Sequence, residues 1–177
     1  MCLSGSTPSL PTTASWESSL PSRAAEVPPT IACRVQERPF DSAAELELLE
    51  TNSDGEAGAV VSFTGLVRGQ PGSKLELQHY PGMTQRQMES IAGEAARRFE
   101  LIAGTVIHRH GILQAGAPIV FVGVSSRHRA AAFDGARFLM DWLKTRAPFW
   151  KREIAADGTA HWVEARTSDD EAAASWD

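Results

Sequence analysis

The sequence predicts an α+β fold, built as a single domain with a mixed or antiparallel sheet and three main helices. Three observations lead to this class. Segments of period two alternate with segments of helical period, and turns containing Gly or Pro join neighbouring strands. Apolar residues make up 42% of the chain, as in soluble proteins with a packed core. The 177 residues suffice for one domain with length left over.

Segments that alternate apolar and polar residues, or that are rich in β-branched residues, predict the strands. In chain order they cover residues 31–35, 58–69, 74–80, 104–111, 117–126, 148–154 and 160–166. The segment APIVFVGVSS is apolar almost throughout, which is typical of a central strand. Asp157-Gly158 lies between the last two segments and predicts the turn that pairs them as a hairpin.

Two helices are predicted in the first half of the domain. Residues 41–52 (DSAAELELLETN) place leucines at helical spacing behind Asp41, a residue type preferred as an N-cap. Pro81-Gly82 then interrupts the chain, and Thr84 is the expected cap of the long helix TQRQMESIAGEAARRF.

The third helix begins near His128, with Ser125 or Ser126 as its expected cap. Its apolar residues cover more than half of the helix circumference, so we expect it to be mostly buried. Pro148 cannot continue a helix, and the residue before a proline disfavours helical geometry, so the helix should end by about Ala147.

The two ends of the chain differ from the part between them. Residues 1–30 contain sixteen Ser, Thr or Pro and half of the ten prolines, a composition that predicts a disordered extension. Residues 167–177 (TSDDEAAASWD) are expected to form an acidic flexible tail. The folded domain is therefore predicted to span residues 31–166.

Composition excludes several classes of protein. The formal net charge is −5, which disfavours a broad nucleic-acid surface. No apolar run approaches the roughly 18 residues of a membrane-spanning helix. Cys2 and Cys33 form no C-x-x-C pair, so a zinc site or a disulfide framework has no support. We expect a protein of the reducing cytoplasm.

A local cluster of cations stands out in this acidic chain. Lys144, Arg146, Lys151 and Arg152 lie within nine residues, around a Pro-Phe-Trp sequence. They are either solvated charges near a helix end or the wall of a pocket for an anion. A lysine beside other cations and an aromatic wall should have a lowered pKa, which suits a general acid or base. On a strand, Lys151 and Arg152 face opposite ways.

Other candidate residues lie at the ends of elements. His128 and Arg129 open the third helix, whose free N–H groups attract anions, although these side chains could equally point into solvent. Arg68 follows a strand, a common place for ligand contacts. His108 and His110 alternate on a strand, but without further ligands they do not predict a metal site.

Six segments together carry a resemblance to a known family. They are FTGLVRG, HYPGMT, VIHRHG, IVFVGVSSRHRAAAF, MDWLKTRAPFWKRE and WVEAR. In this order, over about residues 31–166, the chain resembles the catalytic (large) subunit of molybdopterin synthase. The resemblance implies an α/β hammerhead-like fold and a sulfurtransferase of molybdenum cofactor biosynthesis. It implies no metal and no cofactor bound by this subunit.

The resemblance also implies partners. Sulfur would come from the C-terminal Gly-Gly thiocarboxylate of a small ubiquitin-like subunit and pass to cyclic pyranopterin monophosphate, the pterin substrate. Neither cysteine of this chain is placed as a sulfur donor. The implied assembly is a heterotetramer with a homodimer of large subunits at its centre, without nucleic acid or membrane.

The resemblance assigns roles to nine residues. Lys144 and Lys151 would be catalytic. The implied substrate-binding residues are Leu66, Val67, Arg68, His128, Arg129, Lys144, Lys151, Arg152 and Glu153. His128 and Arg129 would come from the second copy of the dimer.

Two other interpretations compete with this one. A scaffold that holds a ubiquitin-like tail without chemistry would also need an apolar and cationic groove, although it would not need all of these residues. A nucleic-acid protein that uses the cluster at residues 144–152 is disfavoured by the net charge.

Overall fold

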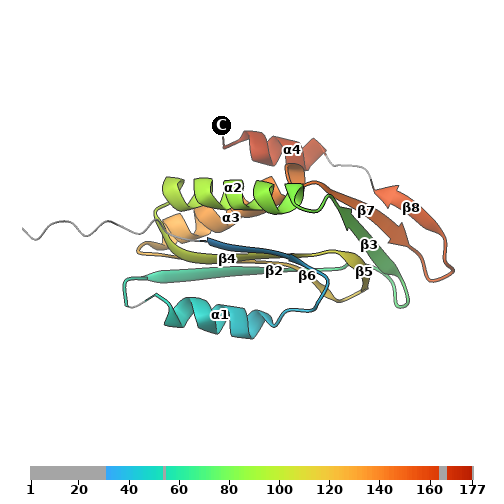
Figure 1. The fold of residues 1–177 in the computed structure, drawn as a ribbon, viewed down its shortest axis with the longest axis horizontal. Coiled ribbons are helices and arrows are strands. Elements are labelled where there is room, and N and C mark those ends of the chain that lie inside the picture. Colours follow the sequence, from blue (N-terminus) through green and yellow to red (C-terminus); the bar gives the residue numbers. More distant parts are fainter. Residues whose placement is uncertain (1–30, 54, 164–166, 177) are drawn as a thin grey trace, which may run out of the picture.

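Two four-stranded sheets form the frame of the protein. The computed structural model describes residues 31–53, 55–163 and 167–176 (Figure 1). The first sheet has the order β1-β4-β6-β2, and its strands are β1 (Ile31–Gln36), β2 (Ala59–Leu66), β4 (Leu101–Arg109) and β6 (Pro118–Ser126). Strand β1 runs parallel to β4, whereas β6 is antiparallel to both of its neighbours. This sheet is therefore mixed, as the sequence predicts.

The second sheet is antiparallel throughout and lies at one end of the first (Figure 1). Its order is β5-β3-β7-β8, and its strands are β3 (Lys74–His79), β5 (Gly111–Gln114), β7 (Phe149–Ile154) and β8 (Ala160–Val163). The turn between β7 and β8 contains Gly158 at φ +88°, which confirms the predicted hairpin. Strand β5 was not predicted, because its four residues are too few for a periodicity to show.

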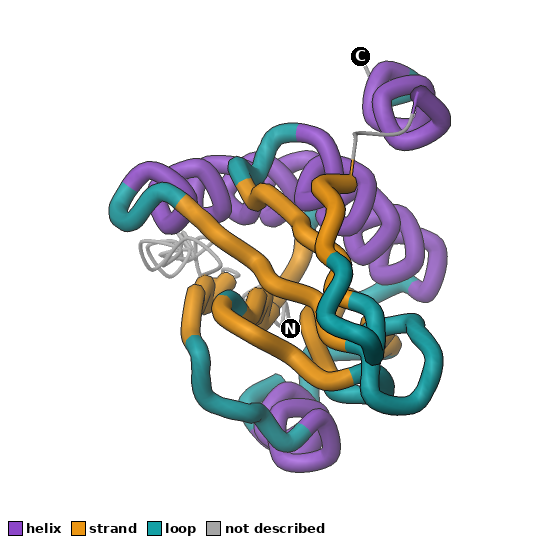
Figure 2. Tube along the Cα trace, turned by 90° about the vertical axis from the view of Figure 1, so that its right-hand side faces the viewer, coloured by secondary structure: helices purple, strands orange, loops and turns teal. Residues whose placement is uncertain are grey.

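The helices cover both faces of the first sheet. They are α1 (Ser42–Thr51), α2 (Met83–Arg98), α3 (Arg129–Thr145) and α4 (Thr167–Ala174). Helices α2 and α3 lie on one face, and α1 lies on the other (Figures 1 and 2). Helix α4 packs on α3, outside these layers.

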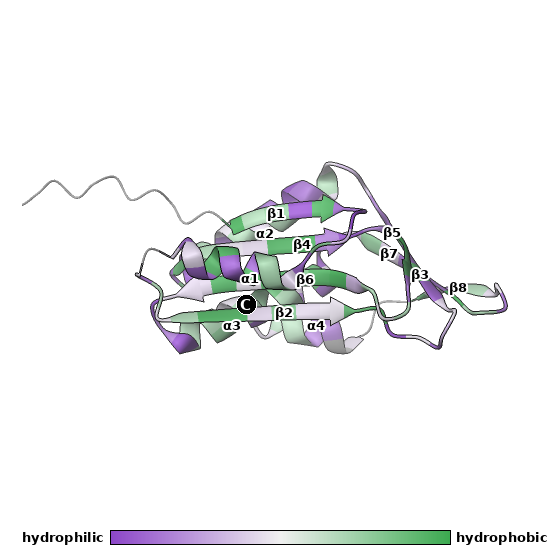
Figure 3. Ribbon diagram, turned by 90° about the horizontal axis from the view of Figure 1, so that it is seen from below, coloured by the Kyte–Doolittle hydropathy of each residue, from purple (hydrophilic) through white to green (hydrophobic). Residues whose placement is uncertain are grey.

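The main core lies between the first sheet and helices α2 and α3. It includes Met88 and Ala95 of α2, Val122 of β6, and Phe138 and Leu139 of α3. Seen from the α1 side, the strands lie in the order β1, β4, β6, β2, with hydrophobic stretches along β4 and β6 (Figure 3). The apolar segment predicted as a central strand is thus central in the sheet.

A smaller core lies under α1, where Leu49 packs on Ile107 and Phe121. Gly123 makes this approach possible, because a Cβ built there would lie 2.4 Å from Leu49 Cδ1. A side chain at this position of β6 would push α1 away from the sheet.

The helix starts test three sequence predictions. Asp41 caps α1 as predicted, and its Oδ1 accepts from the backbone N–H of Ala43 at 2.9 Å. Thr84 is not a cap: it is buried in the first turn of α2, where its hydroxyl donates to the carbonyl of Tyr80 at 3.0 Å, and Gly82 takes the cap position. His128, rather than either serine, is the N-cap of α3.

The acidic C-terminal segment is helical rather than a flexible tail. Residues 167–174 form α4, which the polar composition alone did not reveal, because contacts to α3 and α2 hold it. The extension predicted for residues 1–30 lies outside the described residues. Among the helices that the structure describes, none is both long and apolar enough to cross a membrane.

Candidate functional site

A pocket of about 530 Å³ opens beside the C-terminal end of α3. Its lining includes Phe63, Thr64, Gly65, Leu66, Val67 and Arg68 from β2 and the following loop, Met140, Leu143 and Lys144 from α3, Phe149, Lys151 and Glu153 from β7, His108 from β4, and Asp169 from α4. Of the nine predicted site residues, six line this pocket: Leu66, Val67, Arg68, Lys144, Lys151 and Glu153. Segments far apart in the sequence thus form one site.

The strand geometry of β7 explains which of its residues enter the pocket. Side chains alternate between the two faces of a strand. Phe149, Lys151 and Glu153 therefore share the pocket face. Trp150 and Arg152 lie on the opposite face.

Arg152 is engaged on that opposite face of the second sheet. Its Nε donates to Glu76 Oε2 at 2.8 Å, and its guanidinium lies 5.5 Å from the ring centroid of Trp162. Hydrogen bonds from Gln78 and Arg152 lower the pKa of Glu76. Arg152 supports the second sheet. Among the described residues that line the pocket, Lys151 and Glu153 are present and Arg152 is not.

The four clustered cations therefore divide into two kinds. Lys144 and Lys151 face the pocket. Arg146 is the C-cap of α3, and its guanidinium lies 3.5 Å from the ring centroid of Trp142. The expectation of solvated charge near a helix end fits Arg146 alone, Arg152 is engaged by Glu76 and Trp162, and the two lysines line the pocket.

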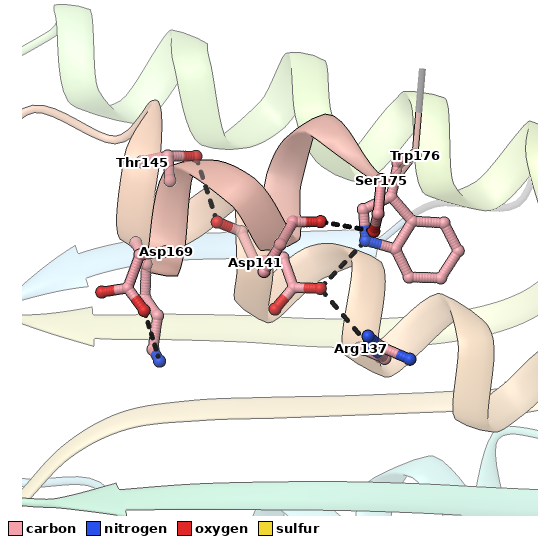
Figure 4. Close-up of polar contacts among 8 residues, drawn as sticks. Arg137, Asp141, Thr145, Asp169, Ser175 and Trp176 are labelled. Atoms are coloured by element: carbon pink, nitrogen blue, oxygen red, sulfur yellow. Dashed lines mark hydrogen bonds and ion pairs between the residues drawn. The ribbon is translucent and has the colours of Figure 1, made fainter. Parts of the chain in front are cut away.

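An acidic residue from α4 meets Lys144 in the pocket. Lys144 Nζ lies 3.2 Å from Asp169 Oδ1, and both side chains are partly exposed (Figure 4). The other pocket carboxylate, Glu153, lies 3.3 Å from His161 Nε2. Arg68 is exposed on the loop after β2. Lys144 thus meets a carboxylate partner among the pocket residues, and an incoming anion can compete with Asp169 for it.

Trp176 anchors the helix that carries Asp169. Its Nε1–H donates to Asp141 Oδ2 at 2.9 Å, and Asp141 also lies 3.6 Å from Arg137 Nε (Figure 4). The indole meets the rings of Phe99 and Phe138 edge to face, with centroids 5.7 and 5.6 Å away. Asp169 is therefore held at the pocket by an aromatic anchor at the other end of α4.

His108 and Phe149 form an aromatic wall of the pocket. Their rings stack at 3.8 Å with an interplanar angle of 18°. Burial lowers the pKa of His108 to about 4, and the nearby charge of Lys151 acts in the same direction. The imidazole is thus neutral at physiological pH.

The second histidine of the predicted pair takes a different position. His110 follows β4, with its ring 4.4 Å from that of His79 and its Nδ1 3.8 Å from Glu37. Burial, followed by the charge of His110, lowers the pKa of His79. Within the described ranges, no group of three or more His, Cys, Asp or Glu residues is arranged to hold a metal ion.

His128 and Arg129 do not line this pocket. They begin α3, whereas Lys144 lies in its last turn, sixteen residues later. At 1.5 Å per residue, this separation is about 24 Å along the helix. Both side chains are exposed at that distant end.

Met140, His108 and Asp169 are among the pocket residues that sequence reasoning did not assign to the site. Met140 carried a signal, since it lies one turn before Lys144 on the apolar side of the same helix. His108 was considered in the sequence only as a metal ligand and set aside, and nothing local marked its stack on Phe149. Asp169 was missed because it lies in the segment taken for a tail.

Comparison with known sequences gives a consistent family. The family described as MoaE protein matches residues 35–146. A molybdopterin synthase catalytic subunit from Rhizobium meliloti is 52% identical over 149 residues, which cover 82% of this chain and 96% of the relative. One from Escherichia coli is 54% identical over 125 residues, which cover 68% of this chain and 83% of the relative.

Solved structures agree with the sequence comparison. A molybdopterin biosynthesis MoaE protein from Burkholderia ambifaria has a TM-score of 0.71 and 43% identity, and the match covers 83% of this chain and 98% of that protein. Molybdopterin synthase from Staphylococcus aureus has a TM-score of 0.64 at 29% identity, with coverage of 73% and 95%. Because the family match covers more than half of the chain and these relatives cover most of it, this chain belongs to the MoaE family.

Proposed function

We propose that this protein is the catalytic subunit of molybdopterin synthase, a sulfurtransferase of molybdenum cofactor biosynthesis. The observation that carries the proposal is the pocket. Lys74, Lys144 and Lys151 are the chain's three lysines, and the last two line one cavity, together with the arginine that the resemblance also implies. The family membership and the names of the relatives support the same function.

The proposed substrate is cyclic pyranopterin monophosphate, with sulfur delivered as the C-terminal thiocarboxylate of a small ubiquitin-like subunit. A pocket of about 530 Å³ has the size of a small-molecule site. The relatives' designation as a catalytic subunit implies a further subunit. Arg68, Lys144 and Lys151 supply the charge that a phosphate and a thiocarboxylate require.

The resemblance implies that the sulfur comes from the partner, and among the described residues Cys33 is unsuited to donate it. Cys33 lies on β1, and burial raises the pKa of its thiol to about 12. A protonated thiol is a poor nucleophile. As a free thiol, it also suits the reducing cytoplasm, where we place the protein.

The proposed transfer of the first sulfur proceeds in two stages, and the phosphate stays attached through its second ester bond. A lone pair of the thiocarboxylate sulfur forms a C–S bond with a substrate carbon, and the C–O bond to phosphate breaks with its electron pair leaving on oxygen. This gives a thioester between the substrate and the small subunit. Water then adds to the thioester carbonyl, the substrate thiolate leaves, and the small subunit regains a carboxylate. A second small subunit supplies the second sulfur.

The two lysines are proposed to act at different points. Lys144 transfers the proton at the sulfur-transfer centre, a role that contributes about 10²- to 10⁴-fold in rate. Lys151 holds the substrate and balances the negative charge that develops as phosphate leaves. Before substrate arrives, Asp169 accompanies the Lys144 ammonium at 3.2 Å.

We further propose that a second copy of the chain completes the site. His128 and Arg129 lie at the opposite end of α3 from their own pocket. Phe133, 63% exposed, lies near them on α3, and Phe63, 43% exposed, lies on the edge strand β2. Exposed aromatic residues beside an open sheet edge are typical of a protein interface. A homodimer through this surface would bring His128 and Arg129 to the partner's pocket.

The test is turnover with purified components. The chain is mixed with a thiocarboxylated small subunit and cyclic pyranopterin monophosphate, and molybdopterin is detected as its fluorescent oxidised derivative. Lys144→Ala should lower the rate about 100-fold or more. Lys74→Ala is the matched control, because Lys74 is exposed at the start of β3 and should leave the rate unchanged.

Two results would contradict the proposal. Wild-type protein that binds the small subunit but forms no product would support a scaffold instead of an enzyme. Equal rates for the wild type and Lys144→Ala would remove Lys144 from the chemistry, even if the activity itself were established.

A further inference from the structure

Strand β6 is irregular at the point where it enters the pocket wall. Gly65 of β2 pairs with Val120, and the next residue, Leu66, pairs with Pro118. Ile119 lies between these two paired positions and is the extra residue of a β-bulge, which bends a strand and re-aims its side chains. Neighbouring residues of a regular strand face opposite sides, yet Ile119 and Val120 both line the pocket. The bulge therefore builds part of the pocket wall.

The bulge also connects the core of the first sheet to the second sheet. Ile119 packs against the main core and against a separate cluster formed by Val67, Leu77 and Leu113. Leu77 belongs to β3 and Leu113 to β5 of the second sheet. A displaced bulge would therefore disturb the junction of the two sheets together with the pocket wall.

The residues just before the bulge hold the loop that carries Arg68. The backbone N–H of Val67 donates to the carbonyl of Ala117 at 2.9 Å, and the N–H of Gly116 donates to the carbonyl of Val67 at 2.8 Å. Val67 is only 5% exposed, and Arg68 follows it directly in the pocket lining. The position at which β6 begins therefore determines where Arg68 lies.

Arg109 holds the start of β6 from the side of β4, the neighbour of β6 in the first sheet (Figure 3). The pairing of β4 with β6 reaches only to His108 and Val120. Beyond that point, Nη1 of Arg109 donates to the carbonyl of Pro118 at 2.9 Å. Its Nε and Nη2 donate to the carbonyl of Glu37, directly after β1, at 3.1 and 2.9 Å. The Arg109 side chain thus joins three segments of the chain beside the bulge.

The guanidinium of Arg109 is a buried charge, because the residue is only 9% exposed. Burying a charge is costly unless it is hydrogen-bonded, and a guanidinium presents its donors in a rigid planar fork. Three N–H donors of this fork reach two carbonyls that belong to different segments. An apolar side chain would fill the same space without this desolvation cost, so the choice of arginine favours a clamp over simple packing.

We propose that Arg109 is a positioning residue of the pocket: its guanidinium clamps the Pro118 carbonyl and so fixes the bulge at Ile119 and the loop that carries Arg68. Arg109 is not among the described residues that line the pocket, so it acts through the backbone of β6. What the positioned wall does for a substrate rests on the proposed function.

Two variants of the full chain test the clamp. Arg109→Met removes every donor. Arg109→Lys keeps the charge, but a single ammonium lacks the planar fork that reaches both carbonyls. Leu49→Ala is the control, because it destabilises the fold through the small core under α1 and leaves the clamp intact. Urea unfolding gives the overall stability of each protein, and amide hydrogen exchange gives the local stability at the bulge.

The amides of Val67 and Gly116 report on the clamp. In Arg109→Met they should exchange about tenfold faster than in the wild type, since hydrogen bonds from a charged group are lost. Arg109→Lys should give a smaller acceleration. In Leu49→Ala these two amides should keep their wild-type rates, although urea unfolding shows a loss of overall stability.

Steady-state kinetics with the thiocarboxylated small subunit give the consequence at the pocket. The KM for cyclic pyranopterin monophosphate should rise about tenfold in Arg109→Met with kcat unchanged, because a misplaced Arg68 weakens substrate binding while Lys144 and Lys151 stay on other elements. Leu49→Ala should leave both constants unchanged.

Three results would overturn the inference. The first is wild-type exchange of Val67 and Gly116 in Arg109→Met, and the second is equal acceleration in Arg109→Met and Leu49→Ala, which would mark a loss of overall stability only. The third is faster exchange at the bulge with no change in KM. If Arg109→Met does not fold, Arg109→Lys is judged by the same results. The exchange rates need neither substrate nor partner, so they decide the clamp even if the wild type forms no molybdopterin and the proposed function fails.

Discussion

Replacing Trp176 by alanine should release helix α4, and with it Asp169, from the rest of the protein. Trp176 donates a hydrogen bond to the Asp141 carboxylate, and such charged bonds contribute about 1.5–3 kcal/mol. Its edge-to-face contacts with Phe99 and Phe138 contribute about 0.5–1.5 kcal/mol each. Because the indole is half-buried, we take a value near the lower end of this sum, about 3 kcal/mol.

The effect should be local. Helix α4 has eight residues, too few to be stable in isolation. A docking energy reduced by about 3 kcal/mol corresponds to roughly a hundredfold change in the docking equilibrium. Amide hydrogen exchange in residues 167–174 should therefore become about a hundredfold faster, while β4 and β6 keep their protection.

Trp176→Phe is the matched control, because it keeps the aromatic contacts and loses the hydrogen bond. It should accelerate exchange in α4 by an intermediate factor. Unchanged exchange in Trp176→Ala would refute the assignment of Trp176 as the anchor. Equal acceleration throughout β4 and β6 would show that the residue stabilises the whole domain instead.

Three further predictions concern single residues of the site. Asp169→Asn removes an exposed ion pair worth up to about 1 kcal/mol. Steady-state kinetics should therefore give a KM for the anionic substrate that is up to about fivefold lower than in the wild type. A higher KM would show that Asp169 helps substrate binding. For His108, burial lowers the pKa from 6.5 to about 4, so the unfolded chain gains a proton before the folded one as pH falls. The free energy of unfolding should then drop by about 3 kcal/mol between pH 6.5 and 4, and urea titrations of His108→Phe should lack this part of the loss. Arg152→Ala should lower the free energy of unfolding by about 1–2 kcal/mol, because the contacts with Glu76 and Trp162 are lost. The KM for the substrate should not change. A tenfold rise in KM would make Arg152 a substrate contact, as the resemblance implies.

Local features of the structure could be predicted from the sequence because they depend on nearby residues. The cap at Asp41, the end of α3 near Pro148 and the turn at Gly158 follow from the conformations that single residues allow. Alternation along β7 separated Lys151 from Arg152, because side-chain direction has a period of two. The cluster of cations at residues 144–152 could also be recognised from the sequence, because its members are close together along the chain.

Tertiary packing decided the rest. Thr84 has the chemistry of a cap, yet burial beside Tyr80 placed its hydroxyl inside the first turn of α2. Helix α4 exists because Trp176 finds a site formed by α2 and α3, which no short segment encodes. His108 meets Phe149 across 41 positions of sequence, and Asp169 meets Lys144 across 25. The sequence by itself determined which residues carry charge and how each strand and helix presents them. Which of those residues meet depends on how the two sheets and four described helices pack, since contacts between distant segments form only when the whole core assembles.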